Sequence, residues 1–185
     1  MGVNAVGDLD AAAGVIEVDA GVVWGKLMET LDQRQAGSDN PWCIRQKQTG
    51  ADALTLGGAL AANIHGRGLT FAPFVGDVES FKLITASGDE IVCSRTVNPD
   101  WFALAIGGYG LFGVVTSIRL RLMRRVTLRR EVSLETIDEI PARIERKIAE
   151  GCLYGDSTRL SRGRGGGPWR GGSAVVGHHR ALCAA

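Results

Sequence analysis

The chain has 185 residues, of which 22% are charged and 45% hydrophobic, and a formal net charge of +1. These values fit one ordinary folded domain and exclude disorder along the whole chain, which needs low hydrophobicity and high net charge. Charged residues or glycines interrupt every apolar run, so we expect no membrane span. No basic-then-apolar leader segment opens the sequence, which favours a cytoplasmic location.

Hydrophobic periodicity over residues 1–156 predicts a mixed α/β chain of the α+β class, without internal repeats. The predicted strands cover residues 14–19, 81–86, 90–94, 114–122 and 126–134, and the predicted helices cover residues 22–35, 99–106 and 137–148. Ser87-Gly88-Asp89 predicts a hairpin turn between two of the strands. Asn98-Pro99-Asp100 predicts a helix start, with the Asn98 side chain as its cap.

The segment 157–185 differs in composition from the rest of the chain. It contains five arginines but no Asp, Glu or Lys, which leaves a charge of −4 for residues 1–156. It has no sustained apolar period, so we expect it to be disordered. With Trp169 it could bind RNA or single-stranded DNA, or it could be a shifted reading frame that encodes nothing. We favour the second interpretation and expect no nucleic-acid partner, because five arginines neutralise few phosphates.

Metal binding is not expected. His178, His179 and Cys183 lie close together in the sequence, but no fourth ligand or acidic neighbour accompanies them.

The run Gly108–Gly113 matches the dinucleotide fingerprint G-x-G-x-x-G. That fingerprint needs a strand before it and a helix starting at its last glycine. Here a predicted helix precedes the run and a predicted strand follows it. A Rossmann NAD site is therefore not expected.

A second glycine cluster runs from Thr55 to Gly68, with the sequence TLGGALAANIHGRG. Its adjacent glycines would let a ligand approach the backbone, and their amides could form a nest for phosphate oxygens. Asn63 and His65 add hydrogen-bonding groups. The alternative is a tightly packed turn whose histidine is an ordinary core residue, and the residues alone leave both possibilities open.

Four segments in this order carry a family resemblance: GVIEVDAGVVWGKLMETL, QTGADALTLGGALAANIHGRG, GDVESFKLITASGDEIVCS and NPDWFALAIGGYGLFGVVTSIRLRL. Together they resemble the second lobe of the PCMH-type FAD-binding domain in the vanillyl-alcohol oxidase / p-cresol methylhydroxylase superfamily. The Ile64-His65-Gly66 stretch is most similar to decaprenylphosphoryl-ribose oxidase and related FAD-linked sugar or alcohol oxidases.

This resemblance implies a mixed sheet with flanking helices, FAD as cofactor, and an alcohol or sugar substrate that gives hydride to flavin N5. It assigns the pyrophosphate contact to the T-x-G-G turn, the flavin-flanking position to the segment after it, and an adenine contact to the residue after F-G. The matching residues are Gly50, Thr55, Leu56, Gly57, Gly58, Ala62, Asn63, Ile64, His65 and Val114. No residue is assigned a catalytic role.

The resemblance also implies a domain division. Residues 1–125 match the C-terminal part of the FAD-binding domain, 126–156 the beginning of a substrate domain, and 157–185 the arginine-rich tail. The family's first FAD lobe has no counterpart in the sequence, so we expect a fragment with weak or absent FAD binding and no turnover, for which the missing lobe would be a complementing partner.

Overall fold

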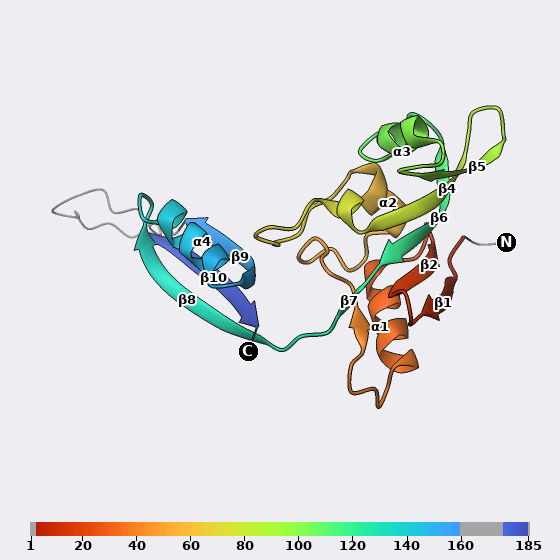
Figure 1. Ribbon diagram of the computed structural model, residues 1–185. Coiled ribbons are helices and arrows are strands. Elements are labelled where there is room, and N and C mark those ends of the chain that lie inside the picture. The colour runs from red at the N-terminus through yellow and green to blue at the C-terminus, as the bar shows by residue number, and fades with distance from the viewer. Residues whose placement is uncertain (1–2, 160–175, 185) are drawn as a thin grey trace. The chain divides into compact units, whose positions relative to one another are not determined.

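The structure is a computed structural model, which describes residues 3–159 and 176–184 (Figure 1). The chain divides into two compact units. Unit 1 comprises residues 1–66 and 72–125, and unit 2 comprises residues 67–71 and 126–185.

Unit 1 is built on a five-stranded antiparallel sheet with the order β1-β2-β6-β4-β5 (Figure 1). The strands are β1 (Val6–Asp10), β2 (Val15–Asp19), β4 (Val78–Ile84), β5 (Glu90–Ser94) and β6 (Val114–Arg121). A separate two-stranded ladder joins β3 (Trp42–Cys43) to β7 (Met123–Arg124). The sheet is thus antiparallel and not mixed, because every strand pairs with a neighbour that runs in the opposite direction.

One face of this sheet is buried under three helices: α1 (Trp24–Arg34), α2 (Leu56–Ala61) and α3 (Pro99–Ala105). Residues of all three share one core cluster with the inward residues of β2, β4, β5 and β6. Phe81 of β4 stacks on Phe102 of α3, with ring centroids 5.4 Å apart. A short 3-10 helix, η1 (Phe74–Gly76), leads into β4 and places Phe74 against Trp24.

The α+β class predicted from the sequence is confirmed, and most of the expected elements of unit 1 lie within three residues of their predicted bounds. The helix starts at Pro99 as predicted, but the prediction that the Asn98 side chain caps it is wrong. Asn98 precedes α3 with a left-handed backbone (φ 49°) and makes no side-chain cap. Its Nδ2 instead donates to the carbonyl of Val92 (2.8 Å), so Asn98 ties the start of α3 to β5.

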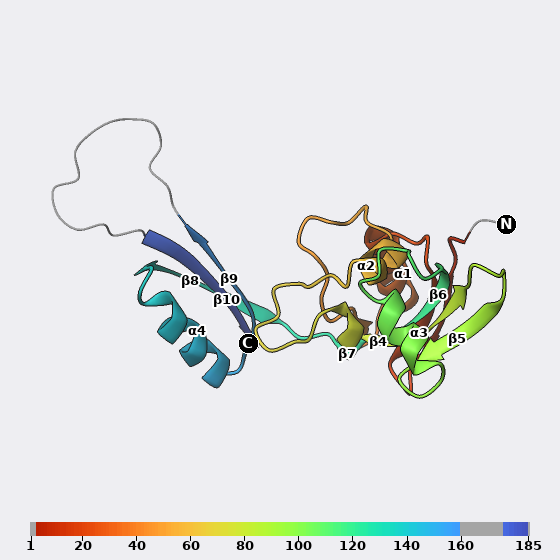
Figure 2. The same ribbon diagram turned by 90° about the horizontal axis from the view of Figure 1, so that it is seen from above.

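Unit 2 contains a three-stranded antiparallel sheet with the order β8-β10-β9 and one helix on it (Figure 1, Figure 2). Its elements are β8 (Leu128–Thr136), α4 (Ile140–Ala149), β9 (Cys152–Arg159) and β10 (Val176–Ala184). The segment 67–71 runs along β9, where Leu69 N–H donates to the carbonyl of Leu153 (2.9 Å) and Phe71 contacts Tyr154 edge-on.

The contact between α4 and β8 is charged. Lys147 Nζ donates to Glu131 (2.5 Å), and Arg143 lies 3.7 Å from Glu135. Two apolar side chains of β8, Val132 and Leu134, do not take part in this contact, since they are 48% and 66% exposed to solvent.

The expected disorder of residues 157–185 is not what the structure describes. Residues 157–159 end β9, and residues 176–184 form β10, which pairs with β8 on one edge and with β9 on the other. A central strand gains main-chain hydrogen bonds from both neighbours, and these need no apolar period. Residues 160–175, with Trp169, and the side chains of His178, His179 and Cys183 lie outside the description.

Candidate functional site

The start of α2 is fixed by Thr55 and two glycines. Thr55 caps the helix, because its Oγ1 accepts a hydrogen bond from the N–H of Gly58 (3.1 Å). Gly57 lies against the end of β2, where an added Cβ would meet the Cβ of Ala20 at 3.0 Å. The T-x-G-G turn therefore has a structural role as well, since it lets α2 lie tightly against β2.

The backbone amides of this turn are occupied within the protein. Leu56 N–H donates to the carbonyl of Val22 and Gly57 N–H to that of Ala20, each at 2.8 Å. With Gly58 N–H bound to Thr55, none of these three amides is free to receive a phosphate oxygen. The anion nest suggested by the glycine pair is thus not formed at these positions.

The loop between α3 and β6 contains the G-x-G-x-x-G run. Helix α3 precedes it and strand β6 follows it, so the order that argued against a Rossmann site is confirmed. Two main-chain hydrogen bonds fix the loop on α2: Gly107 N–H to the carbonyl of Leu60 (3.1 Å) and Tyr109 N–H to that of Ala61 (3.0 Å). At its end, Gly113 has φ 138°, and an added Cβ would lie 2.5 Å from the carbonyl oxygen of Ile84.

A cavity of about 300 Å³ lies between α2 and this loop. All its lining residues are glycines or carry uncharged side chains: Gly57, Gly58, Ala61, Ala105, Tyr109, Gly110, Phe112, Gly113, Val114 and Val115. The fold thus brings together Gly57, Gly58 and Val114, which the sequence resemblance had assigned to one cofactor.

The other predicted site residues do not line this cavity. Leu56 and Ile64 are buried in the core, Gly50 is an exposed turn residue with φ 76°, and Ala62 ends α2. His65 is exposed, and its Nδ1 lies 3.1 Å from the carbonyl oxygen of Gly66. His65 is therefore not the satisfied core histidine of the alternative interpretation.

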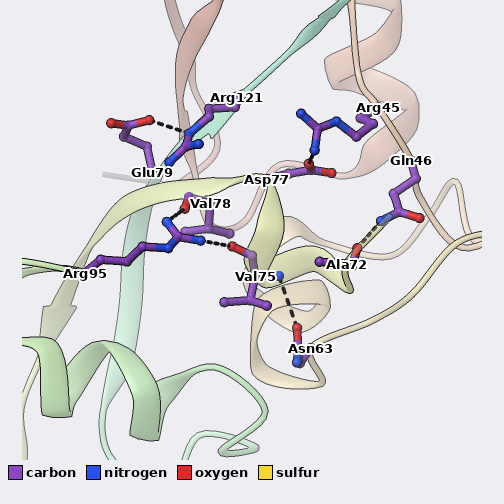
Figure 3. A network of polar contacts seen from close by, with 10 residues as sticks. All are labelled: Arg45, Gln46, Asn63, Ala72, Val75, Asp77, Val78, Glu79, Arg95 and Arg121. Carbon is purple, nitrogen blue, oxygen red and sulfur yellow. Dashed lines mark hydrogen bonds and ion pairs between the residues drawn. The ribbon is translucent and has the colours of Figure 1, made fainter. Parts of the chain in front are cut away.

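Asn63 anchors the segment that follows α2. It adopts a left-handed backbone (φ 41°), and its Oδ1 accepts a hydrogen bond from Val75 N–H (3.1 Å) of η1 (Figure 3). The next residue, Ile64, accepts a 2.7 Å hydrogen bond from Phe74 N–H. Residues 63 and 64 are therefore held by η1.

Side chains from two other segments hold η1 and its junction with β4 (Figure 3). Gln46 donates to the carbonyl of Ala72 (2.5 Å). Arg95 donates to the carbonyls of Val75 (2.6 Å) and Val78 (2.8 Å), and its guanidinium lies over Phe102.

Asp77 is the buried carboxylate of this network. Its carboxylate is almost fully buried and pairs with Arg45 at 3.0 Å, while Arg121 pairs with Glu79 (2.7 Å) beside it (Figure 3). Burial raises the pKa of Asp77 to about 6, and this effect outweighs the lowering by Arg45 and Arg121.

Sequence reasoning missed Tyr109 and Phe112 as cavity residues, because the glycine-rich run that contains them was interpreted only as a turn. It also missed Asp77, Arg45 and Arg95. Their contacts join positions far apart in the sequence, and no local pattern marks them.

Within the described residues, no three His, Cys, Asp or Glu side chains are placed to hold a metal ion. No helix in the same part of the chain has the length and apolarity to cross a membrane.

Comparison with protein families matches residues 1–94 to the model described as FAD binding domain, which is just over half of the chain. This match covers β1 to β5 with α1 and α2.

Among curated proteins, the chain is similar to "L-galactono-1,4-lactone dehydrogenase 2, mitochondrial" of Oryza sativa subsp. japonica, with 30% identity over 143 residues, 77% of this chain and 23% of the relative. It is also 39% identical to "Cytokinin dehydrogenase 4" of the same organism over 70 residues, 37% of this chain and 13% of the relative. "Cytokinin dehydrogenase 1" of Arabidopsis thaliana is 30% identical over 109 residues, 58% of this chain and 18% of the relative. The chain spans less than a quarter of the length of each of these proteins.

Proposed function

Because the chain belongs to the FAD-binding domain family, we propose that it forms part of the FAD site of a flavin-dependent oxidoreductase that oxidises an alcohol or sugar-type hydroxyl. One observation carries the proposal. Gly57 and Gly58 of α2 and Val114 at the start of β6 line one cavity, although more than 50 residues of sequence separate them. We propose that this arrangement belongs to the second lobe of a PCMH-type domain.

The cavity fits part of FAD. Its volume of about 300 Å³ is at the lower end of the range for small-molecule sites, ~300–1,000 Å³. FAD is a large cofactor, so a site of this size would enclose one end of it. We therefore propose that further polypeptide, in the same or a second chain, encloses the rest of the cofactor.

The residues that would hold FAD act through shape and backbone. Gly57 and Gly58 can contribute only main-chain atoms of α2 to the cavity wall, because they carry no side chain. Ala61, Ala105 and Val115 supply apolar walls that exclude water. When bound, FAD supplies the hydride acceptor, and the protein's part is to orient it and shield it from solvent.

A hydroxyl-bearing substrate is supported by the name of one relative, an L-galactono-1,4-lactone dehydrogenase. The cytokinin dehydrogenases among the relatives bear names of a different substrate class. Our assignment to the sugar and alcohol oxidases, and the likeness to decaprenylphosphoryl-ribose oxidase, rests on the Ile64-His65-Gly66 stretch. No residue of this chain is proposed as the catalytic base.

The test is a calorimetric titration of the full chain with FAD. We expect weak but saturable binding, since the cavity encloses only one end of FAD, and we expect Ala61→Leu to weaken it by about tenfold or more, because the larger side chain fills the cavity. The matched control is Ala103→Leu, on the exposed side of α3, which we expect to bind FAD as the unchanged chain does. A folded chain that binds no FAD, or equal binding by the two leucine variants, would overturn the proposal for this cavity.

A further inference from the structure

The face of the unit 1 sheet that points away from the helices has a cavity of its own. Phe81 of β4 and Ile118 of β6 point into the core, so the residues on either side of them point to the other face. A cavity of about 220 Å³ opens there, which we call the sheet hollow. It is lined by Glu17, Ser80, Phe81, Lys82, Val92, Ser117 and Arg119. None of these residues lines the cavity beside α2 that we assign to FAD.

Four polar residues of β4 and β6 form the centre of the sheet hollow. The strand register places Lys82 opposite Ser117 and Ser80 opposite Arg119. The two cationic residues therefore occupy diagonal positions, which lie about 7–8 Å apart in an antiparallel pair. This spacing leaves room for one small group between the two charges. The two serines occupy the other diagonal, so their hydroxyls border the same space.

These polar groups lack partners within the described part of the chain. Lys82 and Arg119 are exposed, and neither takes part in the ion pairs found among the described residues. Ser117 is only 8% exposed, yet its hydroxyl makes no hydrogen bond to any described residue. A hydroxyl so little exposed keeps few contacts with water, so it gains from an acceptor that enters the cavity. This combination of groups indicates a ligand rich in acceptor atoms.

The charge of the sheet hollow selects an anion. Glu17 of β2 lies opposite Arg119, and Val92 of β5 lies opposite Lys82. Two cationic side chains and one carboxylate therefore give the lining residues a net charge of one positive unit. A cavity lined by an excess of one sign of charge attracts ligands of the opposite sign.

Among small anions, a phosphate group fits the side chains best. Arginine presents a planar fork to phosphate oxygens, and lysine binds phosphate as a point charge. Serine hydroxyls donate to further oxygens. A phosphate monoester carries a charge of about −1.5 to −2 at pH 7, which balances both cations, whereas a carboxylate balances only one. The volume of about 220 Å³ lies below the usual range of small-molecule sites, ~300–1,000 Å³, so the ligand is small.

We propose that the sheet hollow binds a phosphate group, carried by inorganic phosphate or by a small phosphate monoester. The phosphate lies between Lys82 and Arg119 and accepts hydrogen bonds from the hydroxyls of Ser80 and Ser117. Glu17 limits the affinity, because its negative charge lies next to Arg119. This inference goes beyond the proposed function, since the site is on the other face of the sheet and needs no FAD.

The experiment is a calorimetric titration of the full chain with inorganic phosphate and with glycerol 3-phosphate, in a buffer of low ionic strength. We expect saturable binding that added sodium chloride weakens. Lys82→Gln and Arg119→Gln should each weaken it by about fivefold or more, because each removes a charge-assisted contact. Tighter binding of glycerol 3-phosphate would support an ester as the ligand, and tighter binding of inorganic phosphate would support the free ion.

Two further variants have effects that a merely structural role would not produce. Glu17→Gln should tighten phosphate binding by about threefold, because it removes a like charge from the site. Ser117→Ala should weaken phosphate binding by about threefold without lowering stability in urea unfolding, because the hydroxyl has no partner in the described chain to lose. A loss of stability together with unchanged phosphate binding would assign Ser117 to the fold and not to the site.

The matched controls are Arg130→Gln and Glu145→Gln, which make the same changes of charge at exposed positions of unit 2. Both should bind phosphate as the unchanged chain does. The proposal is overturned if the folded chain binds neither phosphate nor its ester, or if the Lys82 and Arg119 variants bind as tightly as Arg130→Gln. The FAD proposal would survive that result, because its titration depends on other residues.

Discussion

The carboxylate of Asp77 lies 3.0 Å from the guanidinium of Arg45, and Asp77 is only 3% exposed. The arginine side chain is 32% exposed, so the pair joins a buried acid to a half-buried base. Burial of an ionised carboxylate is unfavourable unless its partners compensate for the lost hydration. Here burial has the larger effect, which is why the pKa of Asp77 rises to about 6.

This pKa predicts an unusual pH dependence of stability. The Asp77 carboxyl binds its proton more tightly in the folded chain than at the ordinary value of 3.8, so protonation favours folding. The contribution is complete below about pH 4 and is lost as the pH rises through about 6. Relative to Asp77→Asn, the unfolding free energy of the unchanged chain should fall by up to about 3 kcal/mol over this range.

Urea unfolding of the two chains between about pH 4 and 7 measures this difference. Asp52→Asn is the matched control, because Asp52 is an exposed carboxylate that also pairs with a basic side chain, Lys47. Parallel pH curves for the unchanged chain and Asp77→Asn would contradict the prediction.

Glu131 in unit 2 should show the opposite sign. The hydrogen bond from Lys147, followed by that from Arg129, lowers the pKa of Glu131 below 4.5. The stabilisation is therefore present above about pH 4.5 and is lost as the pH falls through the lowered value. Glu131→Gln should make unfolding less sensitive to acid, as followed by circular dichroism. Glu145→Gln, an exposed change on α4, should leave the acid sensitivity unchanged.

Asn63 allows its backbone conformation to be separated from its hydrogen bond. Both Asn63→Gly and Asn63→Ala remove the acceptor for Val75 N–H, but only glycine adopts φ 41° without strain. Asn63→Ala should therefore be less stable than Asn63→Gly by about 1 kcal/mol in urea unfolding. Equal stability of the two variants would mean that the left-handed backbone carries no cost at this position.

Gly113 has a steric requirement that Gly110 lacks. An added Cβ at Gly113 would lie 2.5 Å from the Ile84 carbonyl oxygen, whereas at Gly110 it would meet nothing within 4 Å. Both glycines have positive φ, at 138° and 80°. Gly110→Ala should thus cost about 1 kcal/mol and Gly113→Ala at least about 2 kcal/mol. Thermal unfolding compares the two, and an equal loss would show that the contact with Ile84 relaxes freely.

The elements that the sequence predicted well are those with strong local patterns. Alternation in β2 and β6 and the turn at Ser87-Gly88-Asp89 identified the central strands and one hairpin of the sheet. Helix α2 was not predicted, because it contains two glycines and glycine has low helix propensity. It forms because Thr55 caps it and Leu56 and Leu60 are fully buried in the core.

The candidate site was predicted in part. The resemblance named Gly57, Gly58 and Val114, which share the cavity, but the occupied amides of α2 depend on contacts with Ala20 and Val22. Likewise β10 forms by pairing with β8 and β9, and the residues of β10 show no apolar periodicity that would predict a strand. Pairing with strands far away in the sequence cannot be predicted from the local spacing of residues.

The hydrogen bonds that Gln46, Asn63 and Arg95 make to η1 and its flanking residues also affect local unfolding of the native state. Segments joined by such hydrogen bonds exchange their amide hydrogens together, because none can unfold locally without breaking contacts to the others. The N–H groups of Phe74 and Val75 are bound to Ile64 and Asn63. Their deuterium uptake should therefore be as slow as that of β4, and η1 with residues 63 and 64 should exchange as part of the most stable folded unit and not as a mobile loop.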